Sequence, residues 1–257
     1  MPYKDFSSKS LLIMTIALAM FQTTKVDAAL VSYSENFESL IPTSSTALSD
    51  AGFVIYSNSY SDQGLTTMLT SAGSSAAQND YRAFSQVVTG QGGLDQGAQQ
   101  LLVYSNYLSR DQSGLFVDAL TLQQQTIGAA DIGTTWSFSF DAKQGDITGS
   151  SRASAWIRAV DAGITLGEDL LDTTSLGFNW DKYVVSLYID TAWEGKTLEF
   201  GVRSAATGYT MSGVYYDNFY LAQIADASVV PVPAAAWHFS SGLLGLIGMA
   251  RRGTSHN

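Results

Sequence analysis

The chain of 257 residues contains no cysteine, and its only two histidines, His238 and His256, lie near the carboxyl end. Thiol and imidazole groups are therefore missing from the rest of the sequence. This excludes cysteine–histidine catalysis, a serine–histidine–aspartate triad and ordinary zinc sites from that part. Carboxylate chemistry and sites for hard cations stay open. The lack of cysteine is compatible with export, because a chain of this length can bury a core without disulfides.

Basic residues are also scarce, with 13 Lys and Arg against 23 Asp and Glu and a formal net charge of −10. Between Ala29 and Ser228 only eight basic residues accompany 21 acidic ones, so this part carries about −13. Binding to nucleic acid or to anionic lipid depends on clustered Lys and Arg. The sequence therefore predicts that nucleic acid is not a partner.

Long apolar runs are missing too, but a short one stands near the amino end. Lys4 and Lys9 precede a stretch of 11 almost entirely apolar residues, Leu11–Phe21. A small residue, Ala28, follows this stretch. This pattern is typical of a secretory signal peptide and predicts a leader over residues 1–28, cleaved after Ala28. A membrane anchor and an amino-terminal core helix are the alternatives, but 11 residues are too few to cross about 30 Å of hydrocarbon.

Period-2 alternation fills the middle of the sequence. In Thr135–Ala142 the large side chains of Trp136, Phe138 and Phe140 alternate with Ser and Thr. Such runs, separated by Gly, Ser and Asp clusters, are typical of antiparallel strands with one buried face. We expect strands over 53–56, 99–104, 119–127, 135–142, 183–189, 197–202 and 214–221, loops over 71–77 and 89–97, and a short helix over 167–171. The predicted fold is all-β, an antiparallel β-sandwich over residues 29–228.

Four segments of this body carry a family resemblance. They are SENFES (Ser34–Ser39), WSFSFDAK (Trp136–Lys143), WDKYVVSLYI (Trp180–Ile189) and GVYYDNFYL (Gly213–Leu221). The body resembles the calcium-binding jelly rolls of the galactose-binding-like and carbohydrate-binding-module superfamily. The resemblance implies a jelly roll in which structural Ca²⁺ joins the first strand to the last through Glu38 and Asp217, with Glu35 as an alternative to Glu38. It does not identify a carbohydrate.

Asp217 also stands out without the resemblance. Alternation places it on one face with Tyr215, Phe219 and Leu221, which are core-directed. A carboxylate there is costly unless it is paired or bound to a metal, and few basic residues are available. Calcium takes carboxylate and carbonyl oxygens. An edge carboxylate that accepts hydrogen bonds from backbone amides is the alternative.

A candidate sugar site lies in Arg152–Val160. Trp156 alternates onto one polar face with Arg152, Ser154 and Arg158. An exposed aromatic ring between arginines can stack on a sugar while the guanidinium groups donate to its hydroxyls. Arg203 and Tyr188, both directed outward, are assigned to the same surface. Cover by a second sheet or a loop is the alternative for Trp156, and core positions are preferred for Trp136 and Trp180.

The carboxyl-terminal segment, residues 229–257, differs from the body. It contains Val230-Pro231-Val232-Pro233-Ala234-Ala235, then an apolar stretch of 17 residues from Ala234 to Ala250, then Arg251 and Arg252. As a helix the stretch is about 26 Å long, just short of a membrane span, and the arginines would hold its cytoplasmic side.

This order of parts resembles the PEP-CTERM sorting signal in its Val-Pro-Leu-Pro-Ala-Ala variant. His238 after the tryptophan and the GTSHN extension depart from that pattern. The resemblance implies processing by an exosortase, a transpeptidase-like membrane enzyme of Gram-negative bacteria that make extracellular polysaccharide. The protein would be the substrate of that enzyme, exported through the inner membrane and transiently anchored there.

The sequence thus predicts a non-enzymatic surface or matrix protein that associates with extracellular polysaccharide in a biofilm or floc. Two other functions stay open. One is a carbohydrate-active enzyme that uses a carboxylate pair, for which Glu168, Asp169 and Asp172 form the obvious acidic cluster, although solvated loop residues account for such a cluster equally simply. The other is a purely structural matrix protein without a sugar site.

Overall fold

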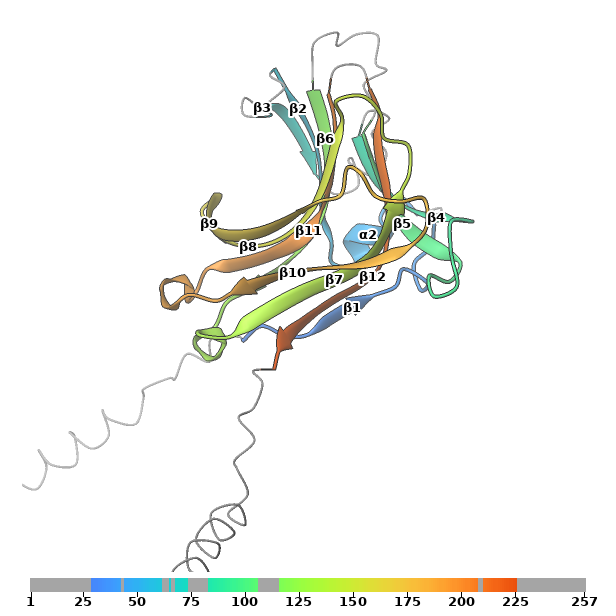
Figure 1. Ribbon diagram of the computed structural model, residues 1–257. Coiled ribbons are helices and arrows are strands. Elements are labelled where there is room, and N and C mark those ends of the chain that lie inside the picture. The colour runs from blue at the N-terminus through green and yellow to red at the C-terminus, as the bar shows by residue number, and fades with distance from the viewer. Residues whose placement is uncertain are drawn as a thin grey trace, which may run out of the picture. The chain divides into compact units, whose positions relative to one another are not determined.

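The computed structural model describes residues 29–42, 44–61, 65, 68–73, 83–105, 116–207 and 210–225. The expected leader and sorting signal lie outside these residues. The described strands form two antiparallel sheets that pack face to face, the predicted jelly-roll β-sandwich (Figure 1). They belong to one compact unit that ends at Ile224. Within the described ranges, no helix has the length and apolar character needed to cross a membrane.

The first sheet, called sheet A here, has the order β10-β7-β12-β5-β4, and β1 pairs with the end of β12. Its strands are β1 (Tyr33–Glu35), β4 (Ala83–Thr89), β5 (Gln99–Ser105), β7 (Thr135–Gln144), β10 (Asp181–Tyr188) and β12 (Ser212–Ile224).

The second sheet, sheet B, has the order β3-β2-β6-β11-β8-β9. Its strands are β2 (Val54–Tyr60), β3 (Met68–Gly73), β6 (Phe116–Thr126), β8 (Arg152–Asp161), β9 (Ile164–Asp172) and β11 (Thr197–Ala206). A one-turn helix, α2 (Ala47–Asp50), and the 3-10 turns η1 (Ala129–Asp131) and η2 (Thr191–Trp193) lie in the connections.

The core lies between the sheets and is rich in aromatic rings. Phe138 and Phe140 of β7 are fully buried, as their alternation predicts, and Phe200 of β11 meets Phe138 from the opposite sheet. Phe138 and Phe219 pack edge to face with ring centroids 5.1 Å apart. Burial of each such side chain contributes about 1.5–3 kcal/mol, so these rings join the two sheets.

Several element predictions were wrong or incomplete. The segment 167–171, expected to be helical, lies in β9, an edge strand whose Gly167 pairs with Ala159 of β8. Its side chains are mostly exposed, so the buried-face alternation that marks a strand is absent from its sequence. Residues 71–73, expected in a loop, end β3, and the pattern-based prediction missed β4 as a strand.

A β-bulge in β12 overturns the predicted direction of Asp217. Asp217 pairs with Asp141 and Tyr220 with Ser139, so two residues of β12 stand against one of β7. Asn218 has a φ of 51° in the left-handed region, which Asn tolerates better than most residues. Tyr216, instead of Tyr215, therefore enters the core. Asp217 belongs to the outer face of sheet A, where it is nevertheless fully buried.

Candidate functional site

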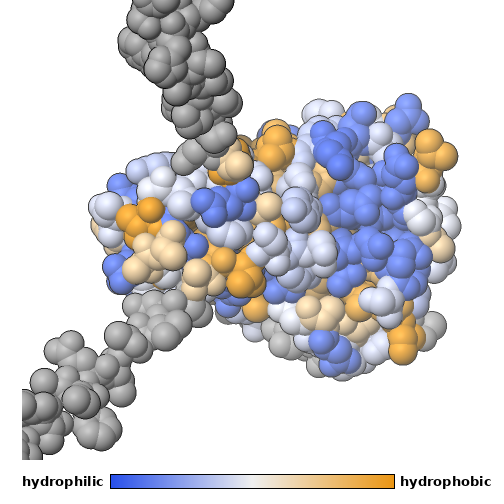
Figure 2. Space-filling model, turned by 90° about the horizontal axis from the view of Figure 1, so that it is seen from below, coloured by the Kyte–Doolittle hydropathy of each residue, from blue (hydrophilic) through white to orange (hydrophobic). Residues whose placement is uncertain are grey.

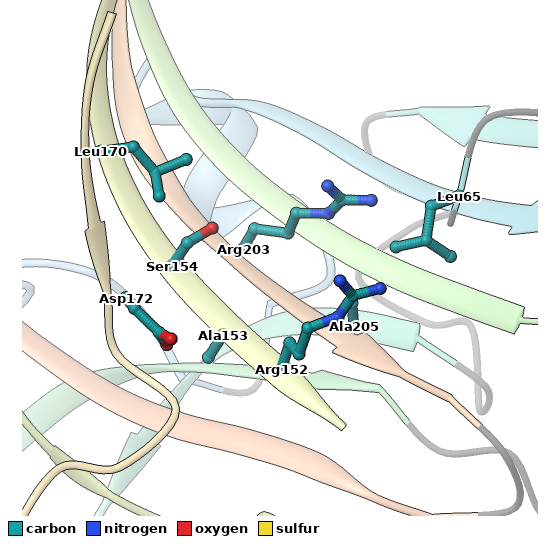
Figure 3. A pocket seen from close by; sticks show the side chains of 8 residues that line it. All are labelled: Leu65, Arg152, Ala153, Ser154, Leu170, Asp172, Arg203 and Ala205. Carbon is teal, nitrogen blue, oxygen red and sulfur yellow. The ribbon is translucent and has the colours of Figure 1, made fainter. Parts of the chain in front are cut away.

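A hollow of about 220 Å³ lies on the outer face of sheet B, and we call it the sheet-B groove. It lies between the curved strands β8, β9 and β11 and Leu65, which belongs to the connection between β2 and β3 (Figure 3). The lining residues are Leu65, Arg152, Ala153, Ser154, Leu170, Asp172, Arg203 and Ala205.

Strand register places the polar lining residues together. Arg203 of β11 stands opposite Ser154 of β8, and Ser154 stands opposite Asp172 of β9. Arg152 lies two residues from Ser154 and therefore on the same face. The side chains of Arg152 and Arg203 both extend on the side of the sheet that faces Leu65 (Figure 3). The groove thus combines cationic donors, a carboxylate acceptor and a hydroxyl with the apolar side chains of Leu65 and Leu170.

A buried carboxylate anchors one of these arginines. Asp118 of β6 is fully buried and forms an ion pair with the Nη2 atom of Arg203. It also accepts hydrogen bonds from Asn58 Nδ2 at 2.9 Å and the Tyr60 hydroxyl at 3.1 Å. Burial raises the pKa of Asp118, against the opposing effect of Arg203. Burial, and then the charge of Asp118, raises the pKa of Tyr60 to about 12.

One hydrogen-bond donor of the Arg203 side chain has no partner among the described residues. Its Nε atom is buried and has no hydrogen-bond partner among the residues that the structure describes. A buried donor without a partner is unfavourable. The fixed guanidinium therefore has an unused donor that a small rearrangement could direct to a ligand or a water molecule.

Trp156 is buried, so the prediction that its ring is exposed for stacking on a sugar is wrong. The side chain lies on the outer face of sheet B, as alternation predicts, but it is only 2% exposed. Its cross-strand neighbours are Gly201 and Leu170, and the Arg158 guanidinium stands over the ring at 5.1 Å. Arg158 is held there by Glu199, at 2.7 Å. Alternation identifies the face of a residue, but the curvature of the sheet decides its depth, so Trp156 is packed beneath its neighbours.

Tyr188 does not belong to this surface either. It pairs with Thr135 of β7 and lies on the outer face of sheet A, 57% exposed. Of the four residues predicted to form a sugar site, the structure therefore brings Arg203 into the groove and leaves Trp156 and Arg158 beside it in a packed cluster. Tyr188 belongs to the other sheet.

Three carboxylates, those of Glu35, Glu38 and Asp141, lie near Asp217 at the outer face of sheet A. Glu38 Oε1 accepts hydrogen bonds from the backbone N–H groups of Ala98 and Gln99, at 2.8 and 2.7 Å. Glu35 Oε1 accepts one from Phe37 N at 2.6 Å. Glu38 and Glu35 therefore accept hydrogen bonds from backbone N–H groups, which is the alternative to metal binding that the sequence left open for an edge carboxylate.

Only one of the two carboxylate oxygens of Asp217 has a hydrogen-bond partner among the described residues. Its Oδ1 accepts a hydrogen bond from Asn218 N at 2.6 Å, while the buried Oδ2 has no partner within the described ranges. The pKa of Asp217 is raised to about 7, chiefly by burial, with contributions from the charges of Asp141, Glu38 and Glu35. The cluster therefore has an excess of negative charge and an unused buried oxygen.

A hard cation fits these two features, because it would neutralise the charge and take Oδ2 as a ligand. Side chains alone do not complete a site, since the described residues contain no group of three or more His, Asp or Glu side chains arranged to hold a metal. Further ligands would have to be carbonyl, amide or water oxygens, which calcium accepts.

The acidic cluster on β9 does not have the geometry of a glycosidase pair. Glu168 and Asp172 share one face but are four residues apart, which separates their backbones by about 13 Å. The catalytic carboxyl groups of glycosidases are about 5–9.5 Å apart. Asp169 points to the opposite face and accepts a hydrogen bond from Ser186 N at 2.7 Å.

The sequence prediction missed Asp118, Asn58, Tyr60 and Leu65. Only Asp118 had a visible signal, because it is a carboxylate inside the apolar run Leu115–Leu122. The other three come from β2 and its following connection, and only the three-dimensional pairing of β2 with β6 brings them to the groove.

No protein-family model matches the sequence, and a search of the curated proteins gives no match. Similar solved structures include the enzymatically active domain of bacteriophage CBA120 tailspike protein 4, at 12% identity and a TM-score of 0.41, over 56% of this chain and 18% of that chain. The present chain therefore spans less than a fifth of that protein's length.

Two further similar structures are covered over most of their length. The CBM22-1 xylan-binding domain of Xyn10C from Paenibacillus barcinonensis has 13% identity and a TM-score of 0.37, over 58% of this chain and 85% of that chain. An apo cyclase from Fischerella sp. has 15% identity and a TM-score of 0.39, over 65% and 82%. The neighbours thus include carbohydrate-binding modules and enzymes, and such likenesses do not identify a ligand.

Proposed function

We propose that this protein is an exported, non-enzymatic polysaccharide-binding protein and that the sheet-B groove is its binding face. The observation that carries the proposal is the convergence of Arg152, Arg203 and Asp172 on one hollow that also has apolar walls. Ligand sites commonly combine a few placed polar groups with apolar surface. A sugar ring has the matching chemistry, with hydroxyls at its edge and C–H groups on its faces.

Each groove residue has a role in this proposal. The planar guanidinium groups of Arg152 and Arg203 donate to neighbouring hydroxyls in a fixed geometry, and Asp172 accepts from a hydroxyl. The Asp118 pair holds Arg203 in place before binding, which reduces the entropy lost on binding. The volume of about 220 Å³ is below the usual range for ligand pockets. The groove therefore suits one sugar unit of a chain whose neighbouring units lie in solvent.

Structural calcium is part of the proposal. Ca²⁺ would be held by Asp217 and by Glu38 or Glu35, and would connect the segment after β1 to β12. The support is the unused Oδ2 atom and the raised pKa of Asp217. Because the ion would bind only the folded chain, its role would be stability, not chemistry.

The location of the protein is proposed from its two ends. Residues 1–28 would direct export, and residues 229–257 would be processed by an exosortase-type membrane enzyme. The domain would then reach the cell surface or the extracellular matrix of a polysaccharide-producing Gram-negative bacterium. The end of the last described strand at Ile224 supports this arrangement, because the proposed signal begins only after that strand.

Affinity electrophoresis tests the binding function. The protein is run through native gels that contain xylan, mixed-linkage β-glucan or alginate, beside the Arg152→Gln and Lys196→Gln variants. We expect retardation by at least one polymer and about tenfold weaker binding for Arg152→Gln, as loss of a charged hydrogen bond implies. Lys196 pairs with Asp161 away from the groove, so its variant controls for the lost charge. Equal retardation of the two variants would contradict the proposal.

A further inference from the structure

The outer face of sheet A presents two tyrosine rings that the proposed function does not use. Tyr220 of β12 is 49% exposed and Tyr188 of β10 is 57% exposed. The bulge at Asn218 makes Tyr220 point outward, since it returns Phe219 and Leu221 to the core. Both rings therefore stand on one face, opposite to the face that meets the core.

Small neighbours leave these rings uncovered. Tyr220 stands between Ser34 of β1 and Ser139 of β7, and Tyr188 stands beside Thr135. A ring on a sheet is usually covered by the side chains of its cross-strand neighbours. Here the neighbours are short hydroxyl residues, so ring surface and hydroxyls are exposed together.

A polar hollow adjoins Tyr220 on the side that faces away from Tyr188. A polar depression of about 530 Å³ lies beside Tyr220 and is lined by residues that include Glu35, Asn36, Lys182 and Asn218. The view from below shows hydrophilic residues gathered over one half of the molecule and several hydrophobic residues over the other half (Figure 2). Val184 and Ile224 are also exposed on this face, at 58% and 43%, in the cross-strand rows of Tyr220 and Tyr188 respectively.

The two rings have a spacing suited to an extended ligand. Strand β7 lies between β12 and β10, and its Ser139 pairs with Tyr220 on one side and Val184 on the other. Tyr188 lies four residues further along β10 than Val184. Strand geometry then separates the two positions by roughly 17 Å. A ligand that contacts both must be a chain, because a single sugar is far too short.

We propose that the outer face of sheet A is a second glycan-binding face that takes an extended, neutral polysaccharide. Tyr188 and Tyr220 would stack on sugar rings, while Asn36 and Lys182 would bond to hydroxyls beside Tyr220. The polymer is neutral because the Glu35 carboxylate lines the depression, and other carboxylates of the same face are unneutralised wherever no cation is bound. These charges repel an acidic chain.

A second face changes what the domain does. The two faces lie on opposite sides of the sandwich, so one domain can hold two polysaccharide chains at once. Such bivalency turns a binding module into a cross-linker of a polymer matrix and increases the apparent affinity without new contacts. This inference rests on the proposed function only in that the groove supplies the first of the two faces.

The second glycan-binding face is tested by measuring cross-linking and binding separately. The purified protein is titrated into soluble mixed-linkage β-glucan, with low-shear viscosity reporting cross-links and affinity electrophoresis in the same polymer reporting binding. The variants are Tyr188→Ala/Tyr220→Ala, Arg152→Gln, and Phe178→Ala as an exposed aromatic control, since Phe178 is 79% exposed on another part of the surface. Circular dichroism confirms folding of each variant, because none of these side chains is buried.

We expect the native protein and Phe178→Ala to raise the viscosity, and the double tyrosine variant to lose that rise while still binding through the groove. A double variant that behaves like Phe178→Ala in both measurements would overturn the second face and leave the groove intact. If Arg152→Gln binds normally while the tyrosine variant loses all binding, the groove fails and the second face stands. Absence of binding by every form, native protein included, to mixed-linkage β-glucan, xylan and alginate would overturn both faces.

Discussion

Arg203 reaches from β11 to Asp118 on β6 and forms an ion pair in which the carboxylate is buried while the Arg203 side chain stays 29% exposed. The pair lies on the outer face of a sheet, where solvent is normally available to charges. Its burial comes from the curvature of sheet B and from Asn58 and Tyr60, which complete the hydrogen bonds of Asp118. Arg203 is thereby positioned at the groove before any ligand arrives.

The Asp118→Asn variant tests this positioning. It keeps the size of the side chain but removes the charge that holds Arg203, and we expect it to lower the free energy of unfolding by about 3 kcal/mol, as for a broken buried ion pair. Urea denaturation measures the change. A loss below about 1 kcal/mol, the value of a surface pair, would show that Asp118 does not anchor Arg203.

Trp156 is expected to behave as a buried residue. Truncation in Trp156→Ala removes a packed ring and should lower the free energy of unfolding by about 3–5 kcal/mol. Trp156→Phe retains much of the ring and removes the indole N–H that has no partner among the described residues, so it should be milder. Thermal and urea unfolding of both variants provide the comparison. A Trp156→Ala protein with an unchanged melting temperature would mean that the ring is exposed after all.

The sequence predicted the β-sandwich well, because alternation in segments such as Thr135–Ala142 reports a buried face directly. It failed where that relation breaks down. The exposed edge strand β9 buries too little to alternate, and the bulge at Asn218 shifts the alternation of β12 by one residue. That shift is why Asp217 was assigned to the wrong face, although its unusual environment was anticipated.

The candidate site was predictable only in part. Arg152 and Arg203 were recognisable as outward residues of strands, since both alternate with apolar side chains. The depth of Trp156 depends on the curvature of sheet B, and the partnership of Arg203 depends on the pairing of β6 with β11. Both properties arise from contacts between segments far apart in the chain, which a local pattern does not contain.

The Asp217 carboxyl should make stability depend on pH when calcium is absent. Its pKa is about 7 in the folded protein against a usual value of 3.8, so the folded state holds this proton more tightly than the unfolded chain. The stability it gives is full below about pH 4 and is lost as the pH rises through 7. In chelator, the melting temperature of the native protein should therefore fall between about pH 4 and 7 relative to Asp217→Asn.

Calcium should reverse that loss, because it favours the ionised carboxylate. At a hundredfold excess over its dissociation constant it should stabilise the fold by about 2.7 kcal/mol, and Asp217→Asn should abolish the effect. Glu168→Gln, which changes a carboxylate outside the cluster, is the matched control. Equal melting curves for native protein with and without calcium would leave Asp217 as a buried acid without a metal role.

Deletion of Val230–Asn257 should leave the sandwich folded, since β12 ends at Ile224. In cells the shortened protein should appear in the periplasm or the medium. Replacement of Val232-Pro233 by Ala-Ala should stop processing, because the prolines keep the motif extended and accessible to an enzyme. Fractionation and mass spectrometry locate each product. An aggregated truncation product, or normal maturation of the proline variant, would contradict the sorting function.

Binding at the sheet-B groove is the central claim, and an NMR titration tests it most directly. Isotope-labelled protein is titrated with a hexasaccharide cut from whichever polymer retards it, and backbone amide shifts are followed. The account predicts concerted shifts at Arg152, Ser154, Asp172 and Arg203, and loss of these shifts in Arg152→Gln but not in Lys196→Gln. Saturable binding that leaves the amides of β8 and β11 unmoved would place the glycan elsewhere and contradict the claim.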